Sequence, residues 1–173
     1  MLVAGTSGAG KTTLARRVAE VLQIPHIELD ALHHGPAWKP RETFAVDVEA
    51  FSAEPRWVTE WQYGLVRDLL AERADLLIWL DLPRRTVMRQ VVCRTLRRRL
   101  RREVLWNGNT EPPLRTIFTD REHVVRWAWS GHHRSALRVA AVRERWPELA
   151  IVRLDSRAAI ERWCGGPLRA TGR

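Results

Sequence analysis

Residues 5–12 read Gly-Thr-Ser-Gly-Ala-Gly-Lys-Thr and complete the phosphate-binding motif G-x-x-x-x-G-K-[ST], known as Walker A. The glycines allow successive backbone N–H groups to turn inward and surround phosphate oxygens. The ammonium group of Lys11 suits the outer phosphates, and the hydroxyl of Thr12 suits Mg²⁺. We therefore expect a nucleoside triphosphate to bind Gly5, Thr6, Ser7, Gly8, Ala9, Gly10, Lys11, Thr12 and Thr13.

The motif indicates a phosphate-binding loop only where it stands between a buried strand and a helix, and the residues on both sides of it have these patterns. Residues 1–4 are apolar, as in a buried parallel strand. Leu14, Val18, Val21 and Leu22 recur at helical spacing, and Pro25 ends that pattern. The octet therefore predicts a strand–loop–helix unit in which the helix N-terminus faces an anion.

The chain has 173 residues, of which 45% are hydrophobic, and we expect one domain over residues 1–173. No apolar run approaches the roughly 18 residues of a membrane span, and the N-terminus lacks the pattern of a signal peptide. Cys93 and Cys164 have no metal-ligand spacing. These features predict a cytoplasmic protein with two reduced thiols and no membrane partner.

The net charge is +9, yet Lys11 and Lys39 are the only lysines among 29 basic residues. Because a compact ammonium differs in shape from a guanidinium, a lysine within the octet strengthens its interpretation. The basic excess is compatible with anionic partners, either nucleotides or nucleic acid. The second option defines an alternative function, a nucleic-acid-associated ATPase or polynucleotide kinase. Against it, the arginines are spread along the chain and no nucleic-acid-binding motif is present.

Strand-like and helical patterns alternate after the octet. Strands are expected over residues 24–30, 57–61, 76–80 and 149–154, and helices over residues 41–53, 65–70, 84–106 and 114–146. A break near Ser130 and Gly131 could divide the last of these helices. Ser156 is a candidate N-cap for a terminal helix that Gly165 and Gly166 end. The pattern predicts an α/β fold with a parallel sheet.

Two carboxylates stand at the expected ends of strands, at the sheet edge where ligands bind in open α/β folds. Asp30 would hold a Mg²⁺-bound water or orient an acceptor hydroxyl, and the alternative is a turn cap. Glu60 would be the acidic partner of Mg²⁺ through water, and the alternative is a solvated strand end.

Arginines crowd two turns of the helix expected over residues 84–106, and Arg94, Arg98 and Arg102 share one face. A guanidinium near a γ-phosphate stabilises the charge that develops during phosphoryl transfer. We assign Arg94 and Arg98 this catalytic role first, and Arg102 next as a phosphate contact. The alternative is a solvated helix face in an arginine-rich chain.

Four stretches resemble the small P-loop kinases, similar to adenylate kinase and shikimate kinase. They are residues 29–34 with Trp38 shortly after, residues 57–60, residues 78–83, and residues 94–111 ending in Trp-Asn-Gly-Asn-Thr-Glu. The chain is most similar to a bacterial group labelled adenylate-kinase-like or "DNA topology modulation" proteins. The resemblance implies a three-layer fold with a five-stranded parallel sheet, helices on both faces and a helical lid near residues 98–115.

The resemblance also implies ATP or GTP with Mg²⁺, a mobile acceptor-binding segment over about residues 31–70, and Asp30 facing the phosphate loop. In that segment His33, Trp38, Glu60 and Arg67 are candidate substrate contacts, with Trp38 favoured because its Gly-Pro-rich loop lies where acceptors bind in similar kinases. Ser156 and Arg157 lie where such kinases hold the adenine edge.

One position departs from the group. Its members have Asp-Gly-Asn-Tyr after the third strand, where this chain has Glu60-Trp61-Gln62-Tyr63. An indole thus replaces a glycine next to the expected acceptor site. The leading hypothesis is an ATP-dependent small-molecule or nucleotide kinase. Besides the nucleic-acid alternative, Trp61 motivates a third option, a regulatory nucleotide-binding module without turnover.

Overall fold

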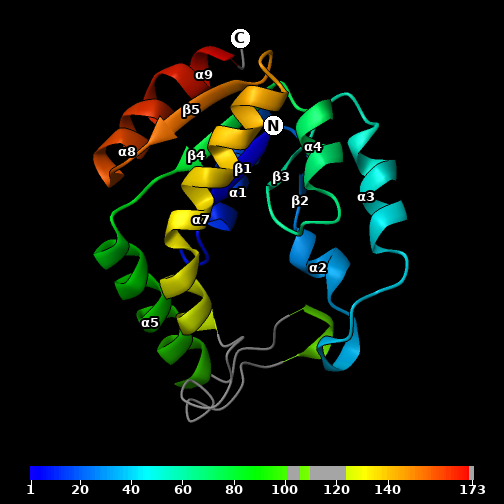
Figure 1. The fold of residues 1–173 in the computed structure, drawn as a ribbon, viewed down its shortest axis with the longest axis vertical. Coiled ribbons are helices and arrows are strands. Elements are labelled where there is room, and N and C mark those ends of the chain that lie inside the picture. Colours follow the sequence, from blue (N-terminus) through cyan, green and yellow to red (C-terminus); the bar gives the residue numbers. More distant parts are fainter. Residues whose placement is uncertain (101–105, 110–123, 172–173) are drawn as a thin grey trace.

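The computed structural model describes residues 1–100, 106–109 and 124–171 (Figure 1). Its strands are β1 Leu2–Gly5, β2 His26–Ile27, β3 Val58–Glu60, β4 Leu76–Leu80 and β5 Ala150–Leu154. All four pairings are parallel, and the order across the sheet is β2-β3-β1-β4-β5. The α/β fold with a five-stranded parallel sheet is therefore confirmed.

Helices cover both faces of this sheet because alternate residues of the central strands point to opposite sides. Leu2 and Ala4 of β1 belong to one buried cluster, whereas Val3 belongs to the other. Helices α1 Lys11–Leu22, α8 Arg157–Gly165 and α9 Pro167–Thr171 pack with the Val3 side. Helices α3 Phe44–Ser52, α4 Arg67–Arg73 and α7 Val124–Arg145 pack with the other. The expected three layers result.

The remaining elements surround the end of the sheet to which the strands run (Figure 1). They are α2 Leu29–His33, the 3-10 turns η1 Pro36–Trp38 and η2 Trp106–Gly108, and the long helix α5 Arg84–Leu100. Helix α5 packs along α7, and η2 lies against α2 and η1. Segments far apart in the sequence therefore meet at one end of the sheet.

Two expectations for local structure are wrong. The second strand does not reach Asp30, because the backbone N–H of Leu29 is bonded to the Glu60 carboxylate and the chain turns there into α2. Helix α7 runs without a break through Ser130 and Gly131. The interior glycine costs about 1 kcal/mol relative to alanine, and packing of the helix on α5 and β1 tolerates it.

Where they are described, the other elements agree with the sequence to within a few residues. Residues 101–105 and 114–123, which belong to the helices expected over 84–106 and 114–146, lie outside the described residues, as does most of the lid expected near 98–115. Ser156 does cap α8, where its Oγ accepts a hydrogen bond from the N–H of Ala159 at 3.2 Å. Among the described residues, none of the helices combines the length and the apolar character needed to cross a bilayer.

Candidate active site

The loop between β1 and α1 has the backbone geometry that its glycines predicted. Gly8 and Gly10 adopt left-handed conformations with φ of 81° and 97°, and Gly10 is the N-cap residue of α1. The N–H of Ala9 bonds to the carbonyl of Thr6 at 3.0 Å and closes the turn. A Cβ at Gly8 would lie 2.0 Å from Cγ2 of Val91 in α5, so only glycine fits beneath that helix.

Lys11 begins α1 and points back over the loop. Its Nζ donates a hydrogen bond to the carbonyl of Thr6 at 3.4 Å. Burial lowers the pKa of Lys11, while the charges of Asp30 and Glu60 raise it and that of Arg94 lowers it further. A triphosphate in the loop would favour the charged form, as Asp30 and Glu60 do.

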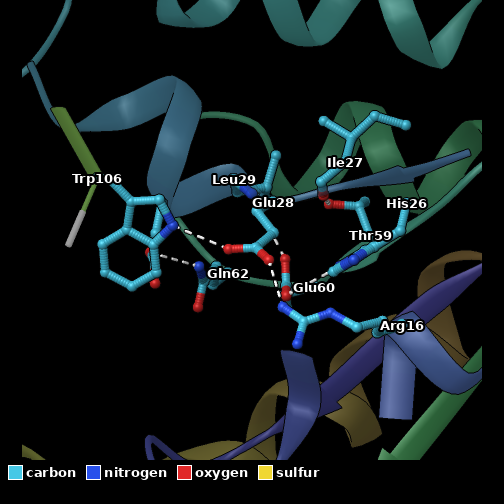
Figure 2. Close-up of polar contacts among 10 residues, drawn as sticks. Arg16, His26, Ile27, Glu28, Leu29, Thr59, Glu60, Gln62 and Trp106 are labelled. Atoms are coloured by element: carbon cyan, nitrogen blue, oxygen red, sulfur yellow. Dashed lines mark hydrogen bonds and ion pairs between the residues drawn. The ribbon is translucent and has the colours of Figure 1, made fainter. Parts of the chain in front are cut away.

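Glu60 is 2% exposed, so the expected alternative of a solvated strand end is wrong. Its Oε1 lies 3.2 Å from Nε2 of His26, and its Oε2 accepts from the N–H of Leu29 at 3.4 Å (Figure 2). Burial raises the pKa of Glu60, but hydrogen bonds from His26 and Thr12 outweigh it and hold the pKa below its ordinary value. The structure thus brings together Thr12 and Glu60, the two oxygen donors predicted for Mg²⁺.

These two residues fit the ion, because a hydroxyl and an ionised carboxylate beside the phosphate loop are hard oxygen ligands. In the part of the chain that is described, no cluster of three or more His, Cys, Asp or Glu side chains is placed to hold a metal by itself. A Mg²⁺ here would take its remaining ligands from water and phosphate oxygens.

Asp30 is held from one side by the segment that follows β3. Its Oδ1 accepts hydrogen bonds from Nε2 of Gln62 at 2.7 Å and from the hydroxyl of Tyr63 at 2.5 Å. The Tyr63 oxygen also lies 3.1 Å from Nε2 of His34. Burial, with the charge of Asp30, raises the pKa of Tyr63 far above its usual range, so its hydroxyl remains a donor. Asp30 therefore has one oxygen fixed by two neutral groups.

A cleft of about 1090 Å³ joins the phosphate loop to this network. The predicted residues that line it are Ser7, Gly8, Ala9, Gly10, Lys11, Thr12, Thr13, Asp30, Trp38, Arg94, Arg98 and Arg157. Arg94 and Arg98 come from α5 and Asp30 from α2, and the guanidinium of Arg98 lies 5.8 Å from the centre of the Trp106 ring. Gln62 and His34 also line the cleft, although neither was a sequence candidate.

Other predicted residues lie elsewhere. His33 is stacked on Tyr63, with ring centroids 4.1 Å apart, and does not line the cleft. The guanidinium of Arg67 lies 5.8 Å from the centre of the Trp61 ring. Ser156 caps α8, and Arg102 lies outside the described residues.

Trp61 points away from the cleft. The indole is 7% exposed within the cluster of α3, α4 and α7, and its Nε1 donates to the carbonyl of Arg67 at 3.1 Å. The residue that replaces glycine in the resembled group is therefore a core residue, and the cleft beside it stays open.

The segment Trp106–Asn109 is bonded to the chain after β2. Nε1 of Trp106 donates to Glu28 at 2.8 Å, and Arg16 pairs with the same carboxylate at 2.9 Å (Figure 2). Asn109 is buried, donates to the carbonyl of Gly35 at 2.9 Å and accepts from the N–H of Trp38 at 3.1 Å. Glu28 and Asn109 were missed from sequence because no motif marks a bond between residues more than 70 positions apart.

Comparison with known proteins supports the fold. The structure resembles a gluconokinase from Sinorhizobium meliloti, with a TM-score of 0.51, 19% identity, and coverage of 99% of this chain and 91% of that one. It also resembles a shikimate kinase from Acinetobacter baumannii in complex with shikimate, with a TM-score of 0.55, 16% identity, and coverage of 98% and 90%. Likeness at this identity establishes the fold alone, an α/β fold that the chain shares with these two kinases.

No protein-family model matches the chain. One sequence match is a cytidylate kinase from Nitratidesulfovibrio vulgaris, 51% identical over 35 residues. That stretch is 20% of this chain and spans only 15% of the cytidylate kinase. Membership of the narrower "DNA topology modulation" group stays a prediction from the sequence.

Proposed function

We propose that this protein is an ATP-dependent phosphotransferase that moves the γ-phosphoryl group to a small acceptor. One observation carries the proposal. The phosphate loop, the arginines of α5 and the carboxylate of Asp30 line a single cleft at the end of the parallel sheet. The neighbours with the same fold are named kinases, as is the short sequence match.

Each set of residues has one task in this proposal. The N–H groups of the loop and Lys11 bind and align the triphosphate, with the base toward Arg157. Arg94 and Arg98 stabilise negative charge on the transferred group. Thr12, and Glu60 through water, would hold Mg²⁺, which neutralises phosphate charge when it is bound.

We place the acceptor between Asp30, Trp38 and Trp106, because these residues line the part of the cleft formed by α2, η1 and η2. We keep one kinase domain over residues 1–173 and a lid near residues 98–115 as parts of the proposal. The nucleic-acid alternative rests on the net charge and on the arginine-dense helix α5. Arg16, Arg145 and Arg153, which also contribute to that charge, are paired with carboxylates in the structure.

The test uses the two lysines of the chain as a matched pair. Lys11→Ala should lower the rate of ATP turnover by about 10²-fold or more, which is the scale of losing one preorganised charge-stabilising donor. Lys39→Ala removes an exposed lysine that does not line the cleft and should leave turnover unchanged. Turnover that survives intact in Lys11→Ala would exclude the phosphotransferase.

A further inference from the structure

We infer that the phosphoryl acceptor is a neutral hydroxyl group and not a phosphate, and that Gln62 and Tyr63 position Asp30 to bind that hydroxyl. This inference rests on the proposed kinase function and specifies the chemical class of its phosphoryl acceptor. It separates two kinds of kinase, one that makes a phosphate ester from an alcohol and one that makes a phosphoanhydride from a phosphate.

The two oxygens of the Asp30 carboxylate have different surroundings. Oδ1 receives both donors, Gln62 and Tyr63. Within residues 1–100, 106–109 and 124–171, no hydrogen bond reaches Oδ2, and Asp30 lines the cleft. A carboxylate oxygen accepts hydrogen bonds, so a group that fits it is a donor, and the O–H of an acceptor alcohol is one.

The negative charge on the acceptor side of the cleft also favours a hydroxyl acceptor. Glu28 and Asp30 both line the acceptor part of the cleft. Of the cations that line the cleft, Arg16 is bonded to Glu28 and Lys11 belongs to the phosphate loop. Arg94 and Arg98 serve the transferred phosphoryl group in the proposed function. A phosphate acceptor would bring negative charge against these carboxylates, whereas a hydroxyl brings a proton that Asp30 can accept.

Tyr63 is held in one orientation by its backbone and by the rings around it. It has a left-handed backbone with φ of 61°, which is rare for a residue other than glycine. The flat face of its ring stacks on His33, and Phe44 meets it edge-on with centroids 5.2 Å apart. Because the phenolic proton is directed to Asp30, the oxygen is left to accept a hydrogen bond from His34. A strained backbone and a packed ring fix one direction of the hydroxyl.

The resulting step balances. The acceptor oxygen forms a bond to the γ-phosphorus while its proton moves to Oδ2 of Asp30. The bond between the γ-phosphorus and the β–γ bridging oxygen breaks, and its electron pair leaves with the ADP. Asp30 then releases the proton to solvent. A phosphate acceptor is already ionised at neutral pH and would need no such base.

The first experiment is a screen of matched acceptors with ATP and Mg²⁺, followed by ³¹P NMR of the products. Each pair is one molecule with and without a phosphate, such as cytidine and cytidine monophosphate, or gluconate and phosphogluconate. We expect phosphate esters from unphosphorylated members. A phosphoanhydride formed from a phosphorylated member would overturn the inference while the proposed function stood.

The second experiment needs no identified acceptor, because water is itself a hydroxyl acceptor in basal ATP hydrolysis. Asp30→Asn should lower kcat by about 10²-fold, the low end of general-base effects, and Tyr63→Phe by about tenfold. Both should leave KM for ATP within about twofold, because neither residue belongs to the phosphate loop. Such a kcat-only loss is not expected of a side chain that only maintains the fold.

Thr43→Val is the matched control. It also removes a hydroxyl bonded to a carboxylate, that of Asp47 at 3.0 Å, but outside the cleft, and should behave as wild type. Wild-type hydrolysis in Tyr63→Phe and Asp30→Asn would overturn the positioning role. Absence of any Lys11-dependent ATP consumption would instead remove the proposed function, and this inference with it.

Discussion

Gly8 offers the sharpest test of how the phosphate loop is built. Its φ of 81° is left-handed, and a Cβ there would lie 2.0 Å from Cγ2 of Val91. Gly8→Ala therefore adds two costs, about 1–2 kcal/mol for the left-handed backbone and about 1–3 kcal/mol for overpacking against α5. Gly10 is the matched position, because its φ of 97° is also left-handed but nothing lies within 4 Å of its Cβ.

We expect Gly10→Ala to lower the free energy of unfolding by about 1–2 kcal/mol and Gly8→Ala by about 2–5 kcal/mol. The assay is urea unfolding of both variants, with the melting temperature as a second readout at about 2–4 °C per kcal/mol for a chain of this size. Gly8→Ala should also weaken ATP binding, because the loop has to move away from α5.

A double-mutant cycle isolates the clash. Val91→Ala removes the methyl group that the new Cβ would meet, so it should cost less in the Gly8→Ala background than in wild type. We expect a coupling free energy of about 1–3 kcal/mol, the overpacking cost. Equal losses for Gly8→Ala and Gly10→Ala, together with a coupling below about 0.5 kcal/mol, would refute the packing argument.

Three further outcomes follow from buried contacts. Glu60→Gln should destabilise the protein at neutral pH, because it removes an ionised carboxylate that the folded state stabilises. The folded pKa of Glu60 lies below its ordinary 4.5, so the stabilisation by this carboxylate is present above pH 4.5 and is lost as pH falls through the folded pKa. The free energies of unfolding of variant and wild type, measured in urea, should therefore converge in acid. Trp61→Gly should cost about 3–5 kcal/mol through the cavity it leaves, with no gain in ATP turnover, and a gain would contradict the core position of the indole. Asn109→Ala leaves the N–H of Trp38 and the carbonyl of Gly35 without their hydrogen-bond partner and should lower the free energy of unfolding by about 1–3 kcal/mol. Hydrogen exchange at the Trp38 amide should become faster, and unchanged exchange there would argue against that bond.

The sequence by itself determined the phosphate loop, its flanking strand and helix, and the parallel sheet. These follow from local rules that need no knowledge of distant residues. Glycine is required where the backbone is left-handed, apolar runs form buried strands, and periodic apolar residues form helices. Lys11 and Thr12 were therefore predictable as loop residues, and Ser156 as a cap.

Only the tertiary structure decided what the other site residues contact. Asp30 meets Tyr63 across 33 positions, and Glu28 meets Trp106 across 78. Trp61 could face the cleft or the core, and packing under α4 selects the core. Such choices depend on which side chains a folded sheet edge brings together, and neither propensity nor periodicity carries that information. The loop is thus encoded locally, whereas the acceptor side is a product of packing.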